Sequence, residues 1–126
     1  MTYLFVLIGG GIGALMRHLS TQFFNAFVPV KYPLGTLFVN CLGALLIGFL
    51  INAFDETRAM DTTGKPLLIT GFLGGYTTFS TYSLETARYF LDGNPKLAVL
   101  NIVLHNGLCL VFVLLGMALH RALAQK

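Results

Sequence analysis

The sequence predicts an all-α integral membrane protein of four transmembrane helices with a break in the third. Hydrophobic residues make up 56% of the 126 residues and charged residues only 10%, whereas a soluble domain carries about 25% charged residues. The mean hydropathy is +0.76. Four stretches with few or no charges approach or exceed the ~20 apolar residues that a spanning helix needs. We therefore treat residues 1–126 as one four-helix transmembrane domain.

The first predicted span runs from about Thr2 to Phe24, and the second from about Leu34 to Phe54. The N-terminus lacks the basic region of a secretory signal peptide, so we expect the first segment to remain as a helix. Arg17 lies well inside that span and must reach water or a polar partner. Cys41 and Cys109 lie inside predicted spans, where cysteine usually packs as a small apolar residue. We expect no disulfide and no metal site from them.

The third span is predicted from about Pro66 to Leu91 and the fourth from about Lys96 to Leu123, with a turn at 92–95 between them. In the third span, Gly74–Gly75 either breaks the helix and frees carbonyls for a cation, or only permits close packing. The spacings Gly9-x-x-x-Gly13 and Gly71-x-x-x-Gly75 permit close helix contact, within one subunit or between two.

The basic residues are balanced between the two ends of the predicted bundle. An even number of spans places both termini on one side of the membrane. One side then carries Arg58, Lys65, Arg121 and Lys126, and the other carries Arg17, Lys31, Arg88 and Lys96. Lys and Arg asymmetry orients membrane proteins, so a balanced chain can insert both ways and pair as an antiparallel dimer. No basic patch or RNA motif indicates a nucleic-acid partner.

Polar and aromatic residues separate onto two faces of the third span. Helical spacing places Thr77, Ser80, Thr81 and Glu85 on one face, with Phe79 and Tyr82 on another. Hydroxyl donors and the positive edges of aromatic rings suit a small anion, whereas a cation prefers ring faces. The alternative is that the hydroxyls bond to their own helix and the rings only pack.

Other polar side chains lie deep in the second and fourth spans. Asn40 and the pair His105–Asn106 can line a pathway or form hydrogen bonds between helices. A haem ligand at His105 would need a second ligand, and no convincing one is visible.

Catalytic and cofactor motifs find little support. Gly9–Ala14 matches a dinucleotide fingerprint, but the first acidic residue is Asp55, too far on for that role, so helix packing explains the glycines. Glu85 is the only acid clearly inside a span, and no nucleophile with a base is readable, so we predict no enzyme activity. A small multidrug-type proton-coupled exporter is the main alternative function. It would require a carboxylate in the first span, which this sequence lacks.

Three motifs together resemble the Fluc (CrcB) family of fluoride channels. They are Gly9-Gly-Gly-Ile-Gly-Ala-Leu-Met-Arg17, Gly35-Thr-Leu-Phe-Val-Asn40 and Gly71-Phe-Leu-Gly-Gly-Tyr-Thr-Thr-Phe-Ser-Thr-Tyr-Ser-Leu-Glu85. The resemblance implies an antiparallel dual-topology homodimer in the lipid of the bacterial plasma (inner) membrane. It further implies two passive pores, selective for fluoride, which relieve cytoplasmic fluoride toxicity.

The resemblance also assigns residue roles. Phe79 and Tyr82 would form the aromatic box, in which the family usually has phenylalanine at the second position. Opposite the box, a polar track would contain Asn40, Ser80, Thr81 and His105. Further positions implied by the resemblance are Thr36 and Glu85 in the pore, Arg17 in the vestibule, and Gly74 and Thr77, whose carbonyls from both subunits would hold a central structural Na⁺.

Overall fold

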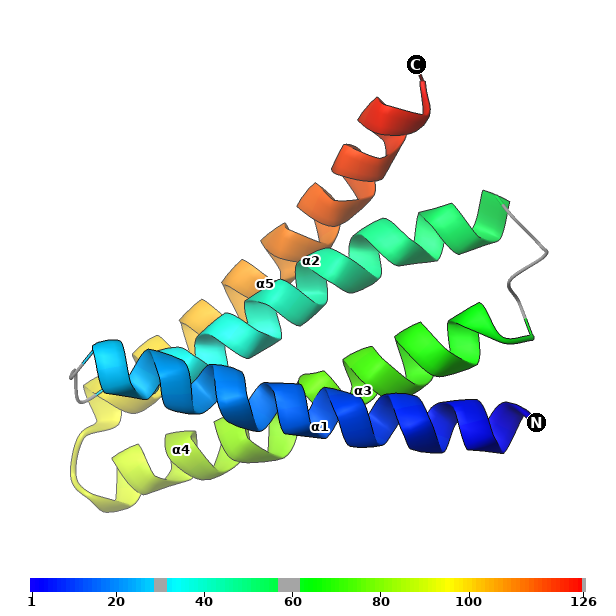
Figure 1. Cartoon of the computed structure of the whole chain (residues 1–126). Helices are drawn as coiled ribbons and strands as arrows, with labels where there is room; N and C mark the ends of the chain where they lie inside the picture. Colours follow the sequence, from blue (N-terminus) through cyan, green and yellow to red (C-terminus); the bar gives the residue numbers. More distant parts are fainter. Residues whose placement is uncertain (29–31, 57–61, 126) are drawn as a thin grey trace.

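The chain is a bundle of long helices in the computed structural model, which describes residues 1–28, 32–56 and 62–125. No strand occurs within these residues. Both termini lie toward the end of the bundle where α2 finishes and η2 begins (Figure 1). The elements are α1 (Thr2–Phe27), α2 (Leu34–Glu56), the π-helix η2 (Lys65–Leu73), α3 (Gly74–Tyr76), α4 (Phe79–Leu91) and α5 (Pro95–Ala124).

Three of these helices are long and apolar enough to cross a membrane. They are α1, α2 and α5, with 26, 23 and 30 residues. Their bounds confirm the predicted spans one, two and four to within a few residues at each end. Pro95 begins α5, where its missing N–H costs no helical hydrogen bond. Gly93, with φ +74°, makes the predicted turn before it. The chain is therefore a multi-pass membrane protein.

The third predicted span is interrupted, and the break falls later than the glycines suggested. Gly74 and Gly75 are helical, while Thr77 (φ −84°, ψ 158°) and Thr78 (φ −149°, ψ 111°) are extended. The prediction of a break was right, but its placement at Gly74–Gly75 was wrong. Gly75 instead permits close packing, because a Cβ there would collide with the Gly10 carbonyl of α1.

The glycines of the Gly-x-x-x-Gly spacings lie at a helix contact within one chain, between α1 and η2. A Cβ on Gly9 would collide with the Leu67 carbonyl, and a Cβ on Gly13 would collide with the Phe72 carbonyl. Gly71 completes the contact from the η2 side. The absence of side chains therefore lets α1 and η2 approach backbone to backbone, which provides the packing that holds helices together in lipid.

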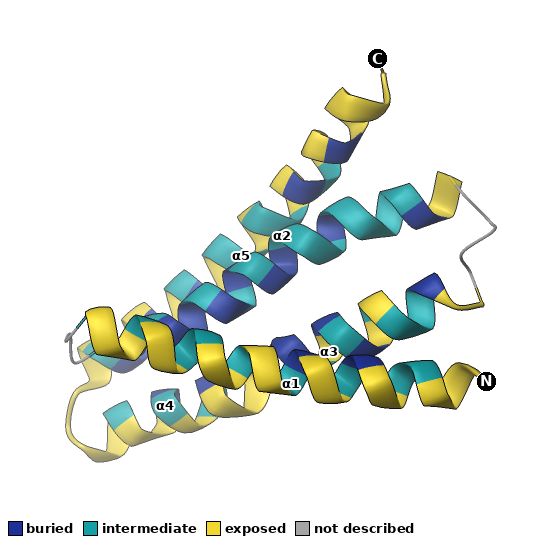
Figure 2. Cartoon of the chain, in the orientation of Figure 1, coloured by how far each residue is buried: buried dark blue, intermediate teal, exposed yellow. Residues whose placement is uncertain are grey.

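The outer surface of the bundle is apolar. Large side chains on α1 and α5 are more than half exposed, including Leu7, Phe23, Leu110 and Leu114. Figure 2 shows exposed residues along most of α1, while buried positions gather where α2 and α5 meet. Such an exposed surface suits contact with lipid chains.

Basic residues lie at both ends of the bundle, as predicted. Lys65 begins η2 and Arg121 lies in the last turn of α5, at the end that holds the termini. Arg88 lies in the last turn of α4 and Lys96 in the first turn of α5, at the other end. The remaining predicted loop and terminal charges, Lys31, Arg58 and Lys126, lie outside the described residues.

Candidate functional site

The helix break is held open by one side chain from α2. Asn40 Oδ1 accepts a hydrogen bond from the Thr78 amide at 2.8 Å, and Asn40 Nδ2 donates to the Thr78 carbonyl at 3.1 Å. In a continuous helix, the Thr78 amide would instead donate to the Gly74 carbonyl, four residues earlier. Asn40 thus satisfies the Thr78 amide, which the break would otherwise leave unpaired. This is an interhelical role, which the sequence left open beside a pathway role.

Thr78 also starts the helix that follows the break. Its Oγ1 accepts from the Thr81 amide at 3.2 Å, which is the usual N-cap bond. The same hydroxyl lies 3.0 Å from Thr81 Oγ1 and 3.2 Å from Ser80 Oγ. Three hydroxyls are therefore clustered at the N-terminus of α4. Sequence reasoning did not single out Thr78, although the pattern of a threonine before an apolar helix is an N-cap signal.

Arg17 reaches the break from α1. Its Nη1 donates to the Thr77 carbonyl at 3.3 Å, which provides the polar partner that an arginine at this depth needs. The Thr77 side chain is turned back onto its own helix, because Oγ1 donates to the Leu73 carbonyl at 2.9 Å. Thr77 precedes the break, so the predicted helical face of Thr77 with Ser80, Thr81 and Glu85 was wrong for its first member.

A polar cavity of about 200 Å³ lies between α1, α2 and the start of α4. Its polar lining carries a guanidinium, an imidazole and hydroxyls, and none of its seven residues has a carboxylate. Such donors can replace the water around an anion. The lining residues are Ala14, Arg17, His18, Thr21, Thr36, Thr78 and Thr81.

An aromatic groove of about 240 Å³ lies between α4 and α5. The centroids of Phe79 and Tyr82 are 5.3 Å apart with the rings tilted by 60°, and those of Tyr82 and His105 are 4.5 Å apart. Phe79 is 76% exposed, whereas Tyr82 is only 8% exposed. The remaining lining residues of the groove are Asn106, Cys109, Leu110 and Val113.

His105 lies on the aromatic side, not with the Thr81 hydroxyl. Its Nδ1 is 3.1 Å from the Asn101 carbonyl, an acceptor, so Nδ1 carries the proton in the neutral ring. Nε2 is buried and has no hydrogen-bond partner among the described residues. A neutral His105 therefore offers a lone pair, which does not suit an anion, and its ring packing is the better-supported contribution.

Asn106 is a residue whose contact with the aromatic groove the sequence did not foresee. Its Nδ2 donates to the Tyr82 hydroxyl at 3.2 Å and to the Ile102 carbonyl at 2.8 Å. The Tyr82 hydroxyl is therefore anchored to α5. The signal available in the sequence was the polar amide side chain of Asn106 next to His105 inside an otherwise apolar helix.

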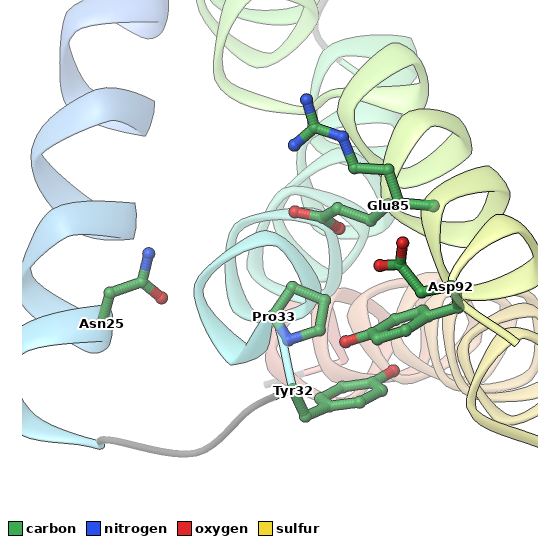
Figure 3. Close-up of a pocket in the computed structure, with 7 residues that line it drawn as sticks. Asn25, Tyr32, Pro33, Glu85 and Asp92 are labelled. Atoms are coloured by element: carbon green, nitrogen blue, oxygen red, sulfur yellow. The ribbon is translucent and has the colours of Figure 1, made fainter. Parts of the chain in front are cut away.

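Glu85 joins Thr36 near a third cavity, of about 350 Å³ (Figure 3). Thr36 Oγ1 donates to Glu85 Oε1 at 2.6 Å, so two residues that were predicted separately are brought together. The cavity lies at the end of the bundle where α4 finishes, and Figure 3 shows Glu85 and Asp92 on one side of it and Asn25 on the other. Its lining residues are Asn25, Tyr32, Pro33, Glu85, Arg88, Tyr89 and Asp92.

Tyr32 connects the rim of this cavity to the core. Its hydroxyl donates to Asn101 Oδ1 at 2.8 Å, and Asn101 Nδ2 donates to Thr86 Oγ1 at 2.9 Å. Burial raises the pKa of Tyr32 to about 12, so the hydroxyl keeps its proton throughout the physiological range. The chain Tyr32–Asn101–Thr86 fixes the start of α2 against α4 and α5.

The predicted site residues therefore form two groups around the break. Thr36, Thr81 and Arg17 line the polar cavity, and Thr36 also contacts Glu85. Phe79, Tyr82 and His105 line the aromatic groove. Gly74 and Thr77 lie just before or at the break, Ser80 lies just after it, and Asn40 contacts it from α2.

Comparison with known proteins identifies the family of the chain. The family model described as "CrcB-like protein, Camphor Resistance (CrcB)" matches residues 4–117. The chain belongs to the CrcB family. A CrcB relative from Hydrogenobaculum, named "Fluoride-specific ion channel FluC", is 48% identical over 92% of this chain and 94% of its own. Relatives of the same name are 42% identical: one from Clostridium perfringens over 95% and 94%, and one from Sulfurovum over 96% of each chain.

The CrcB match covers the break and both groups of site residues. Residues 4–117 include Arg17 on α1, Asn40 on α2, all of α4 and the Asn106 contact on α5. The matched range therefore contains the break and most of the residues around it.

Proposed function

We propose that this chain is a fluoride-selective ion channel of the bacterial inner membrane, which exports toxic cytoplasmic fluoride passively down its gradient. It is proposed to have no enzyme activity. The observation that carries the proposal is the pairing of two features: CrcB relatives named as fluoride-specific channels, and a carboxylate-free polar cavity at a helix break.

The geometry around α4 supports an anion path with two kinds of wall. Thr81, Thr78 and Arg17 supply hydroxyl and guanidinium donors on one side of the helix. Phe79 and Tyr82 supply aromatic ring edges on the other side. Hydroxyl and guanidinium donors and the electropositive edges of aromatic rings suit dehydration of a small hard anion.

The proposed unit is an antiparallel homodimer with two pores. A single chain leaves Phe79 76% exposed, although the function proposed for this ring needs an enclosed path. A second copy in the opposite orientation would cover such faces, and the balance of basic residues permits both orientations. In this arrangement η2, α3 and α4 together make the third membrane crossing of each chain, between α2 and α5.

A structural Na⁺ is proposed at the carbonyls of Gly74 and Thr77 from both subunits. The residues fit a hard cation, because the Thr78 amide that would normally bond to the Gly74 carbonyl is taken by Asn40. The Thr77 carbonyl accepts from Arg17 and retains a second lone pair. These carbonyls would hold the ion and would pin the two helix breaks together.

The same geometry gives less support to the alternative function, a proton-coupled multidrug exporter. Such an exporter needs a membrane-embedded carboxylate shared by a proton and a cationic drug. Helix α1 contains no Asp or Glu, and the Glu85 carboxylate is engaged by Thr36.

The proposal is tested by fluoride efflux from liposomes that contain the purified chain. A potassium gradient with valinomycin drives the anion, and a fluoride electrode reads its release. Rapid release of fluoride but not of chloride is the expected result. Release of neither ion by protein shown to be a folded dimer would contradict the proposal, and proton-coupled drug uptake would favour the exporter.

A further inference from the structure

The two cysteines of the chain lie face to face between α2 and α5. Cys41 and Cys109 are 68 positions apart, yet their sulfur atoms are 4.0 Å apart. Both thiols are free, and Cys41 is buried with 7% exposure. The proposed fluoride function uses neither thiol.

The helices that carry this pair are held at close range. A Cβ on Gly48 of α2 would collide with the Val113 carbonyl, and a Cβ on Gly116 of α5 would collide with the Leu45 carbonyl. Gly48 and Gly116 each lie two turns beyond the cysteine of their own helix, so the dithiol is supported by a rigid backbone contact.

The sulfur separation suits a bridging metal ion better than a disulfide. A disulfide needs the sulfurs at about 2.05 Å, about half of the separation observed here. Two metal–thiolate bonds of about 2.3 Å each would place the sulfurs at most about 4.6 Å apart. The observed 4.0 Å is slightly shorter than that limit, so an ion fits with a small outward adjustment or a bent geometry.

We propose that Cys41 and Cys109 form a binding site for one soft, thiophilic d¹⁰ cation, for which Hg²⁺ is the probe. Soft thiolates select such ions over hard ones. Binding forms two metal–sulfur bonds and releases the two thiol protons to water. The product is a neutral dithiolate complex, which avoids leaving a charge at membrane depth. Within the described chain, no group of three or more His, Cys, Asp and Glu residues adds further ligands.

The site adjoins the aromatic side of the proposed pathway. Cys109 lines the aromatic groove with Phe79 and Tyr82. It also lines a cavity of about 400 Å³ that includes Asn40, Thr77 and Phe79. An ion held by Cys109 therefore lies beside the ring that the anion must pass. Bound Hg²⁺ blocks fluoride flux, a consequence that rests on the proposed function, whereas the binding itself does not.

The binding is tested on the purified full-length protein in detergent by titration with mercuric chloride. Ultraviolet thiolate-to-mercury absorbance and the count of remaining free thiols are read together. The expected result is saturation at one ion per chain with loss of both thiols. Cys41→Ser and Cys109→Ser should each bind on the order of a hundred-fold more weakly, because the second thiolate acts at high effective concentration. Two ions per chain, no binding, or equal affinity in a single-cysteine variant would overturn the proposal.

Fluoride efflux from liposomes then tests the block. Wild-type flux should stop at one ion per chain and return when a dithiol chelator is added, whereas the double variant Cys41→Ser/Cys109→Ser, which has no thiol to hold the ion, should keep its flux at that mercury concentration. Cys41→Ala/Cys109→Ala provides a second variant if serine perturbs folding, which size-exclusion chromatography monitors. Saturated protein that still conducts would overturn the block. Absent flux before mercury is added would instead count against the fluoride function, and the absorbance titration would still decide the site.

Discussion

Asn40 and Thr78 are joined by two hydrogen bonds, of 2.8 Å to the Thr78 amide and 3.1 Å to its carbonyl. A single amide side chain on α2 thereby replaces the helical partner of the Thr78 amide and also bonds to the carbonyl of the same residue. Hydrocarbon supplies no water to satisfy such groups. The position of the break therefore depends on α2 as much as on the broken helix itself.

Asn40→Asp should abolish fluoride efflux. Aspartate keeps the acceptor for the Thr78 amide but loses the donor to its carbonyl and places a negative charge beside the path. Like charges about 4 Å apart repel by ~4 kcal/mol at an effective dielectric of 20, which corresponds to more than a hundred-fold lower flux. The matched control is Asn52→Asp, because Asn52 lies on the same helix and bonds to Met117 at the far end of α5. Equal flux in both variants would contradict the assigned role of Asn40.

Phe79→Ile should lower fluoride efflux by about five-fold, the effect of losing an aromatic-edge contact of roughly 1 kcal/mol. Phe79 is 76% exposed within its chain, so its removal should leave chain folding intact. Phe23→Ile on the outer face of α1 is the control and should conduct normally. Size-exclusion chromatography checks the dimer, and wild-type flux in Phe79→Ile would remove this ring from the pore.

Tyr82→Phe should preserve or raise fluoride efflux, because the ring edge is retained while the hydroxyl bond to Asn106 is lost. Loss of that bond should reduce the free energy of unfolding by about 1 kcal/mol. Tyr76→Phe is the matched control, since its hydroxyl contacts Ser20 Oγ at 3.2 Å, away from the aromatic groove. Complete loss of flux in Tyr82→Phe alone would make the hydroxyl essential to conduction.

Gly13→Ala should destabilise the fold by about 1–3 kcal/mol, because the added methyl group collides with the Phe72 carbonyl. Gly11→Ala is the control, since no atom lies within 4 Å of the added carbon. Thermal unfolding of both variants in one detergent provides the measurement. Similar melting temperatures would show that the α1 and η2 contact is looser than described.

Tyr32 predicts a pH dependence confined to alkaline solution. Its pKa rises from 10.0 to about 12 on folding, so the folded state favours the protonated hydroxyl. The resulting stabilisation is fully present below pH 10 and is lost between pH 10 and 12. The free energies of unfolding of wild type and Tyr32→Phe should therefore approach each other as the pH rises from 10 to 12. If the difference between the two free energies of unfolding instead changed between pH 6 and 8, Tyr32 would not be its cause.

Much of the architecture follows from the sequence alone. Long uncharged runs give helices at Thr2–Phe27, Leu34–Glu56 and Pro95–Ala124, because the backbone must satisfy itself in lipid. The Gly-x-x-x-Gly spacings indicated close helix contact, and the hydroxyls and rings of the third span indicated an anion path. These inferences depend on local composition and spacing, which a single sequence contains.

The tertiary structure decided what depends on partners distant in the chain. The break lies at Thr77–Thr78 and not at Gly74–Gly75, because Asn40 of α2 can pair with Thr78 while Gly75 is needed against α1. His105 joins Tyr82 rather than Thr81, since α5 packs against the aromatic side of α4. The Cys41–Cys109 pair likewise exists only because α2 and α5 meet. Residue spacing determines a helical face, but only packing determines which neighbour that face contacts.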